Sequence, residues 1–95
     1  MEVDVITMKS LPRKNPDIAF RIIDGQGVLV RAGAGEVDVL NRSGTLIWEK
    51  IDGKRSVSDL VESVRDEYEV DGDEAKRDVI EFLEELRTKQ AITIT

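Results

Sequence analysis

Residues 36–52, EVDVLNRSGTLIWEKID, contain the change of hydrophobic period that decides the fold. As far as Leu40, apolar and polar residues alternate, which is typical of a half-buried strand. Asn41 then supplies a side-chain oxygen that can cap a helix, and Gly53 is a suitable residue for ending one. We therefore expect a helix over residues 42–52. Its apolar face consists of Leu46, Ile47, Trp48 and Ile51.

Two further strands are expected before this point. Residues 18–23 alternate, residues 28–32 are rich in valine, and a turn at residues 24–27 separates them. A second glycine-rich turn at residues 33–35 leads into the strand at 36–41. Glycine supplies positive φ without steric cost, so both segments suit hairpin turns. Two short turns in succession indicate an antiparallel sheet of three strands.

Two more helices and a short strand follow. Ser56 and Asp59 have capping-box spacing before a helix that ends near Tyr68, and Asp71 opens another helix over Asp73–Lys89. The apolar stripes are Val57, Leu60, Val61, Val64 and Tyr68 in the former, and Ala75, Val79, Phe82, Leu83 and Leu86 in the latter. The last four residues, rich in β-branched side chains, suit a strand. The fold class is therefore α+β and winged helix-turn-helix-like: a three-stranded antiparallel sheet, three helices and a short C-terminal strand.

A chain of 95 residues fits one domain. We expect an N-terminal arm over residues 1–16, loosely ordered because Pro12 and Pro16 interrupt regular structure, and a domain over residues 17–95. No apolar run approaches the roughly 20 residues of a membrane helix, and the N-terminus lacks the apolar segment of a signal peptide. The expected location is cytoplasmic, without membrane contact.

Cysteine and histidine are both absent from the sequence. Thiolate and imidazole metal sites, iron–sulfur clusters, a cysteine nucleophile and a histidine base are therefore excluded within this chain. We expect a protein that is not an enzyme and binds no cofactor.

The negative charge is concentrated in the C-terminal half. The net charge is −6, and residues 56–90 hold twelve acids and five bases. A recognition helix for DNA needs basic or amide side chains facing the groove, but Arg65 is the only base in the second helix. Repulsion of phosphates argues against a nucleic-acid partner.

The third helix carries apolar residues beside its core stripe. Ile80 lies off that stripe by roughly one 100° step, and with Leu83 it widens the apolar surface toward Lys76 and Arg87. One interpretation is a wider core contact flanked by two exposed bases. The other is the wall of a groove beside a sheet edge, where a peptide can add as a strand.

From Leu11 to Ile92 the chain resembles the PqqD-like family, the recognition domains of pathways that modify ribosomally synthesised peptides. The most specific element is Leu40-Asn41, then a helix, then Asp52-Gly53. The other segments that carry the resemblance are residues 16–21 and 24–25, Val39, Gly44, Ile47-Trp48, residues 54–57, Leu60, Tyr68, Asp78-Val79, Phe82-Leu83 and Leu86. Residues 31–35 resemble the broad family more than its quinone-pathway members, so the peptide substrate stays open.

The resemblance implies a peptide chaperone whose third strand, Glu36–Asn41, receives the leader of a precursor peptide against the helix Asp73–Lys89. The leader would then be presented to a modifying enzyme, often a radical S-adenosylmethionine enzyme, which would hold any cofactor. Lys76 and Arg87 would favour a leader with acids. The candidate peptide-binding residues are Val37, Asp38, Val39, Leu40, Asn41, Lys76, Ile80, Leu83 and Arg87.

An alternative from another class is a winged-helix module for protein–protein interaction or regulation, without a peptide substrate. Exposed strand edges also allow a strand-swapped homodimer.

Overall fold

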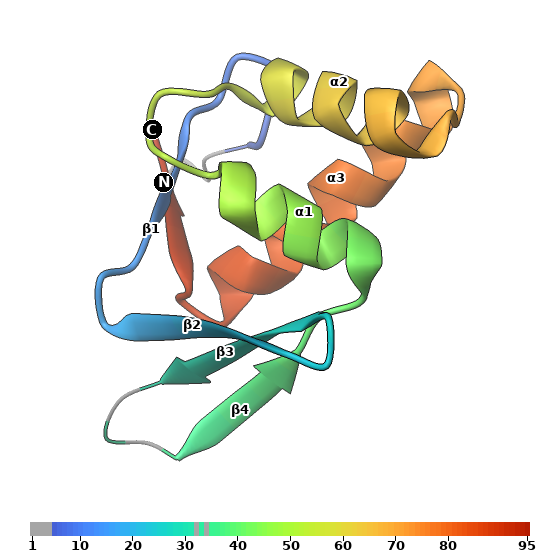
Figure 1. Ribbon diagram of the computed structural model, residues 1–95. Coiled ribbons are helices and arrows are strands. Elements are labelled where there is room, and N and C mark those ends of the chain that lie inside the picture. Colours follow the sequence, from blue (N-terminus) through green and yellow to red (C-terminus); the bar gives the residue numbers. More distant parts are fainter. Residues whose placement is uncertain (1–4, 32, 34) are drawn as a thin grey trace.

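The computed structural model describes residues 5–31, 33 and 35–95. In chain order the elements are β1 (Pro12–Lys14), β2 (Ile18–Ile23), β3 (Gln26–Arg31), β4 (Glu36–Val39), α1 (Arg42–Lys50), α2 (Val57–Tyr68), α3 (Gly72–Thr88) and β5 (Ile92–Ile94). The expected fold class is confirmed: three antiparallel strands form one sheet beside three helices, and a short strand ends the chain (Figure 1). Residues 1–4 of the expected arm, Ala32 and Ala34 lie outside the described residues.

The three-stranded sheet has the order β2-β3-β4. The loop of the β2–β3 hairpin consists of two residues, Asp24 and Gly25, whose φ angles are 52° and 81°. Two positive φ values are the signature of a type I′ turn, whose twist matches that of the flanking strands. The turn is therefore shorter than the four residues expected from sequence. Gln26 pairs with Ile23 and begins β3 two residues before the expected strand.

Gly27 lies where helix α1 packs against β3. Its N–H donates to Thr45 Oγ1 at 2.9 Å. A Cβ at this position would lie 2.8 Å from both Phe20 Cε1 and Thr45 Oγ1. Only glycine fits here without displacing the side chains of Phe20 and Thr45.

We predict that Gly27→Ala lowers the free energy of unfolding by about 1–3 kcal/mol, because overpacking displaces the surrounding groups. Urea unfolding followed by the fluorescence of Trp48, the sole tryptophan, measures this change. The matched control is Gln26→Ala at the exposed neighbouring position, which should have little effect. Equal stability of the two variants would contradict the close approach.

The core lies between the sheet and the helices. Its largest fully buried side chains are Trp48, Ile51, Leu60, Leu83, Ile92, Val57, Val79 and Pro12. The Trp48 ring lies 6.3 Å from the ring of Phe20, centre to centre, and the Lys14 ammonium lies 5.2 Å above it. Desolvation lowers the pKa of Lys14, against the opposing charges of Glu49 and Asp52. Within the described ranges, no helix is long and apolar enough to cross a membrane.

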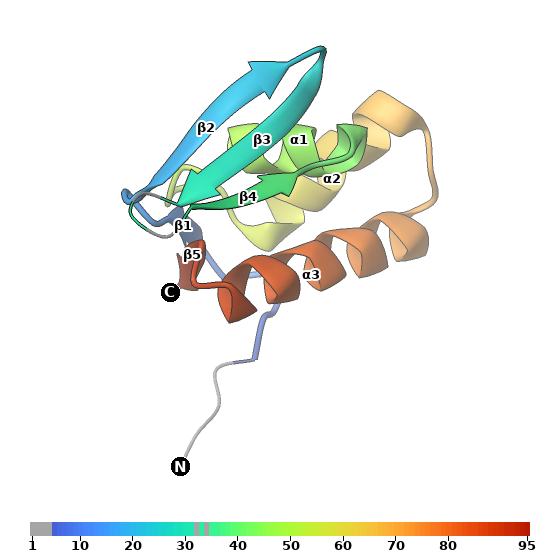
Figure 2. The same ribbon diagram turned by 90° about the horizontal axis from the view of Figure 1, so that it is seen from below.

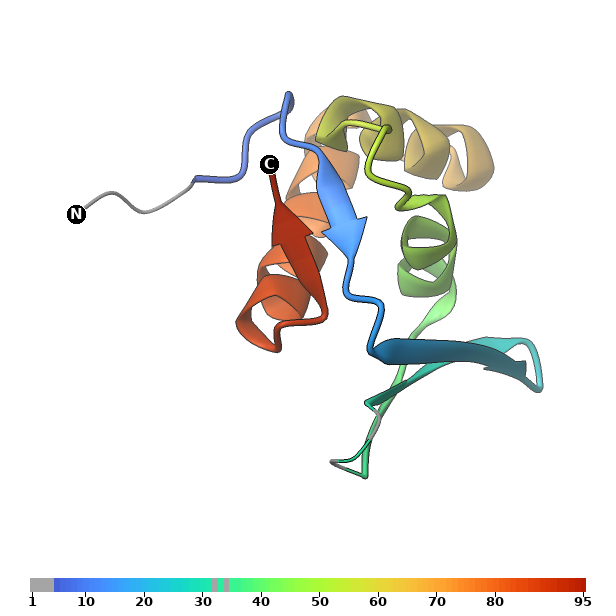
Figure 3. The same cartoon turned by 90° about the vertical axis from the view of Figure 1, so that its left-hand side faces the viewer.

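Within the described part of the expected arm, residues 5–16, Ile6, Ser10 and Pro12 are buried and β1 is a paired strand, so the expected loose order is wrong for these residues. Ile6 is 5% exposed and belongs to the core, and β1 pairs antiparallel with β5 (Figure 3). Leu11 and Thr95 exchange both backbone hydrogen bonds, at 2.8 and 3.1 Å. Because bonded pairs alternate in an antiparallel ladder, Pro12 takes a position whose missing N–H removes no bond to β5.

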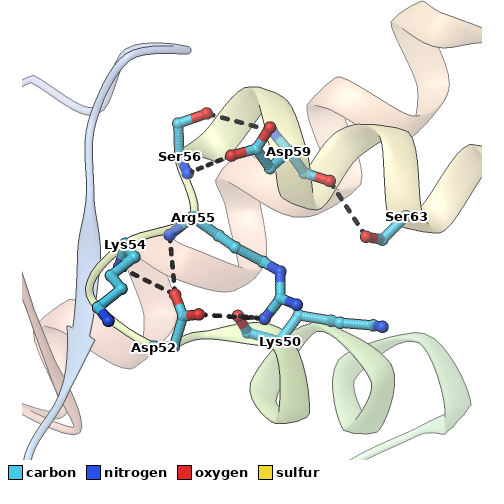
Figure 4. Close-up of polar contacts among 7 residues, drawn as sticks. All are labelled: Lys50, Asp52, Lys54, Arg55, Ser56, Asp59 and Ser63. Atoms are coloured by element: carbon cyan, nitrogen blue, oxygen red, sulfur yellow. Dashed lines mark hydrogen bonds and ion pairs between the residues drawn. The ribbon is translucent and has the colours of Figure 1, made fainter.

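The α1–α2 connection is held by two carboxylates (Figure 4). Asp52 Oδ1 accepts from the backbone N–H groups of Arg55 and Lys54 at 2.8 and 2.9 Å. Ser56 and Asp59 then form the expected capping box at the start of α2. The hydrogen bonds from the backbone N–H groups of Arg55 and, to a smaller extent, Lys54 hold the pKa of Asp52 below its usual value.

We predict that Asp52→Asn lowers the melting temperature at pH 7. A carboxyl whose native pKa is lowered stabilises the fold above its unfolded pKa of about 4, and this contribution disappears as the pH falls through the native pKa. The difference from the unsubstituted protein should therefore shrink below about pH 4. Thermal unfolding from pH 2 to 7 tests this. Asp66→Asn, at an exposed position on α2, is the control and should show a smaller effect at pH 7.

Candidate functional site

Strand β4 presents an open edge. It is the last strand in its sheet, and no other strand of the described chain pairs with its outer side. Leu40 N–H donates to the Gly27 carbonyl at 2.8 Å. Because bonded pairs alternate, Asp38 and Leu40 direct their backbone groups toward β3. Val37 and Val39 therefore direct their N–H and C=O groups outward.

The side chains of β4 alternate between two environments. Val37 and Val39 are 59% and 61% exposed, on the outer face of the sheet. Asp38 faces α3, where its carboxylate lies 3.0 Å from Lys89 Nζ. This ion pair joins the middle of β4 to the C-terminal end of α3, and Figure 2 shows the two elements side by side.

Two adjoining hollows lie along α3, one facing β4 and the other facing the start of α1, and together we call them the groove. The strand hollow, of about 160 Å³, is lined by Asp38, Val39, Leu40, Asn41, Phe82, Glu85, Leu86 and Lys89. The helix hollow, of about 290 Å³, lies beside the start of α1 and is lined by Asn41, Ser43, Gly44, Ile47, Asp78, Glu81, Phe82 and Glu85. Three residues, Asn41, Phe82 and Glu85, line both hollows, so the two hollows are direct neighbours.

Local structure fixes the floor of the groove. Asn41 caps α1, accepting from the Gly44 N–H at 2.7 Å. A Cβ on Gly44 would lie 3.2 Å from Phe82 Cε1, so the absence of a side chain lets the aromatic ring approach the first turn of α1. Phe82 is half-buried and provides the aromatic surface between the two hollows.

Of the expected strand residues, Asp38, Val39, Leu40 and Asn41 line the groove. Val37 contributes to the open edge. The Leu40 side chain is only 6% exposed and belongs to the core, and Asn41 serves as a helix cap. The strand half of the expected site is therefore assembled in one place.

The expected helix residues lie elsewhere. Leu83 is fully buried in the core, and neither Ile80 nor exposed Lys76 lines the groove. Arg87 contacts Glu84 at 2.6 Å and lines a different hollow, beside β5. Helix α3 turns the opposite flank of its core stripe toward β4, so these four residues do not line the groove, and a role for them in peptide binding stays a prediction.

The groove residues of α3 that the sequence prediction lacks include Asp78, Phe82, Glu85 and Lys89, at spacings of four, three and four, together with Glu81 and Leu86. These spacings place them on one helix face. The signal in the sequence is Phe82, a large aromatic residue at the margin of the apolar stripe, because such a residue can serve the core and a groove at once. Across the described ranges, no cluster of three acids is arranged to hold a metal ion. The arrangement offers backbone pairing and side-chain pockets.

Comparisons with known proteins agree with this architecture. Residues 26–92 match the family described as Coenzyme PQQ synthesis protein D (PqqD). No curated protein matches the chain.

Three solved structures have similar folds. TbiB1 in complex with the TbiA(beta) leader peptide has a TM-score of 0.76 and 25% identity, over 84% of this chain and 93% of that one. Lasso peptide synthetase B1, complexed with the leader peptide, has a TM-score of 0.77 and 27% identity, over 86% and 96%. The PqqD truncation of Methylobacterium extorquens PqqCD, described as a stand-alone recognition element for ribosomally synthesised and modified peptides, has a TM-score of 0.77 over 94% and 95%. Its identity is 18%, which supports the fold alone. Since the family match covers more than half of the sequence, the chain belongs to the PqqD family.

Proposed function

We propose that this protein is a non-catalytic recognition domain, which binds the leader of a ribosomally made precursor peptide as an added strand on β4. The observation that carries the proposal is the open edge of β4 beside the groove. The leader-peptide complexes of TbiB1 and lasso peptide synthetase B1 support it, since both proteins have this fold.

Strand addition uses the groups that β4 leaves unpaired. The outward N–H and C=O groups of Val37 and Val39 offer main-chain hydrogen bonds, each with a net contribution of about 0.5–1.5 kcal/mol. Side chains of an added strand alternate between the two faces. Those on the outer face pack beside the exposed valines, and those on the inner face enter the groove against Phe82.

The role is that of an adaptor rather than an enzyme. The chain has no histidine or cysteine for acid–base or nucleophilic chemistry. Chemistry on the peptide therefore falls to a partner enzyme. The resemblance to peptide-modification pathways favours a radical S-adenosylmethionine enzyme, which would hold the cofactor.

One prediction of strand addition uses Val37→Pro. Proline removes the outward N–H without touching the bonds between β3 and β4, and such positions on edge strands tolerate proline. We expect at least about a threefold loss of affinity for a synthetic leader of the precursor encoded beside the gene, matching the loss of one hydrogen bond. Fluorescence anisotropy measures the affinity, and Val37→Thr, which keeps the N–H, is the control.

Amide chemical shifts of the labelled protein locate the bound peptide. Changes concentrated in residues 36–41 agree with strand addition. Strand addition would be contradicted by saturable binding that leaves the amide shifts of residues 36–41 unchanged, or by a leader affinity that Val37→Pro does not lower.

Another prediction distinguishes the two flanks of α3. Phe82→Ala removes the aromatic surface of the groove and should weaken leader binding by about tenfold or more, as truncation of an aromatic anchor does. Ile80→Ala is the matched control, because Ile80 is also half-buried but does not line the groove. Circular dichroism and Trp48 fluorescence confirm that both variants are folded before their affinities are compared. A greater loss for Ile80→Ala would restore the flank first expected from sequence.

A further inference from the structure

The helix hollow is acidic. Three of its lining side chains are the carboxylates of Asp78, Glu81 and Glu85, and no lysine or arginine lines it. All three residues are exposed, and within the described part of the chain their side chains form no ion pair or hydrogen bond. Asp38, the acid that β4 contributes to the strand hollow, is by contrast paired with Lys89.

The positive charge near the helix hollow is smaller than the negative charge of its three carboxylates. The first turn of α1 points its N–H groups toward this region, and a helix N-terminus carries roughly half a unit of positive charge. The Asn41 side chain already accepts from one of these groups. Arg77 lies four residues before Glu81 but forms no ion pair with it, and Arg42 lines a hollow on another side of α1. Three carboxylates therefore dominate the local field.

The geometry also fixes where along a bound peptide this charge acts. Strand β4 and helix α3 run side by side, with Asp38 beside Lys89 and Asn41 beside Phe82 and Glu85. Phe82 and Asp78 are one helical turn apart, roughly 6 Å along the axis, which is close to the span of two strand residues. Side chains that share a face of a strand are also two residues apart.

We propose that the groove selects a leader in which a large apolar residue and a lysine or arginine stand two positions apart. The apolar side chain packs on Phe82 in the strand hollow, and the cation enters the helix hollow among Asp78, Glu81 and Glu85. The inference rests on the proposed function, because the open edge of β4 is the site and the acids determine which strand it accepts. It reverses the preference for acidic leaders expected from Lys76 and Arg87, which lie off the groove.

The test is a selection from a display library of random 14-residue peptides on three immobilised proteins. These are the unsubstituted chain, the groove variant D78N/E81Q/E85Q, and a control variant E49Q/D66N/E67Q. The control acids are exposed and do not line the groove. Both variants change the net charge equally, from −6 to −3, which separates the local field from attraction by the whole chain.

The expected result is enrichment of lysine and arginine two positions from a large apolar residue, on the unsubstituted chain and on the control but not on the groove variant. For one selected peptide, the groove variant should weaken binding by about tenfold, since each exposed ion pair contributes up to about 1 kcal/mol. Replacing its basic residue by glutamate should weaken binding at least as much. Affinity should also fall as salt rises.

Other outcomes separate the two proposals. Peptides that shift the amides of residues 36–41 but show no basic preference, or keep it on the groove variant, would overturn this inference and leave strand addition standing. Peptides that bind without involving β4, or the absence of any selected peptide, would overturn the proposed function and this inference together.

Discussion

Four hydrogen bonds join the end of β4 to the first turn of α1, and the position of the groove depends on them. Leu40 N–H donates to the Gly27 carbonyl, and Gly27 N–H donates to the Thr45 hydroxyl. That hydroxyl donates in turn to the Asn41 carbonyl, while the Asn41 side chain accepts from Gly44 N–H. Each bond has a net contribution of only about 1 kcal/mol, but they share atoms and residues, so the strand cannot rotate without disrupting the helix start. The outward edge of β4 is thereby held beside α3.

Much of this arrangement is readable from sequence, because its signals are local. The change of period at Asn41, the Asp24-Gly25 turn and the capping box at Ser56 each depend on a few neighbouring residues. Strand β1 is not predictable from local sequence, because its partner β5 lies some 80 residues away and because Pro12 is typical of an interruption in regular structure. Proline disrupts a ladder only where its N–H is needed, and that depends on a register that no local pattern reveals.

The candidate binding site likewise has one half that the sequence predicts and one half that it does not. Its strand half follows from the alternation of β4, whereas its helix half requires knowing which flank of α3 meets the sheet. At 100° per residue, Phe82 and Ile80 lie on opposite sides of the core stripe, and both are half-buried. The periodicity of the sequence identifies the core stripe of α3, but it does not show which flank of that stripe lies beside β4. In the folded protein the groove lies on the Phe82 flank, because Gly44 has no side chain and the Phe82 ring can therefore approach the start of α1.

An edge that accepts a peptide also risks accepting a second copy of itself. Strand β4 is four residues long and carries Glu36 and Asp38. Each of these acids is paired within its own chain, Glu36 with Arg31 and Asp38 with Lys89, and β4 of a second copy offers no lysine or arginine to the carboxylates of the groove. Like charges in apposition disfavour association and suppress wrong partners. The field proposed to select a basic leader therefore also opposes a strand-swapped dimer through β4. An acidic groove thus allows the edge to stay open without a covering strand of its own.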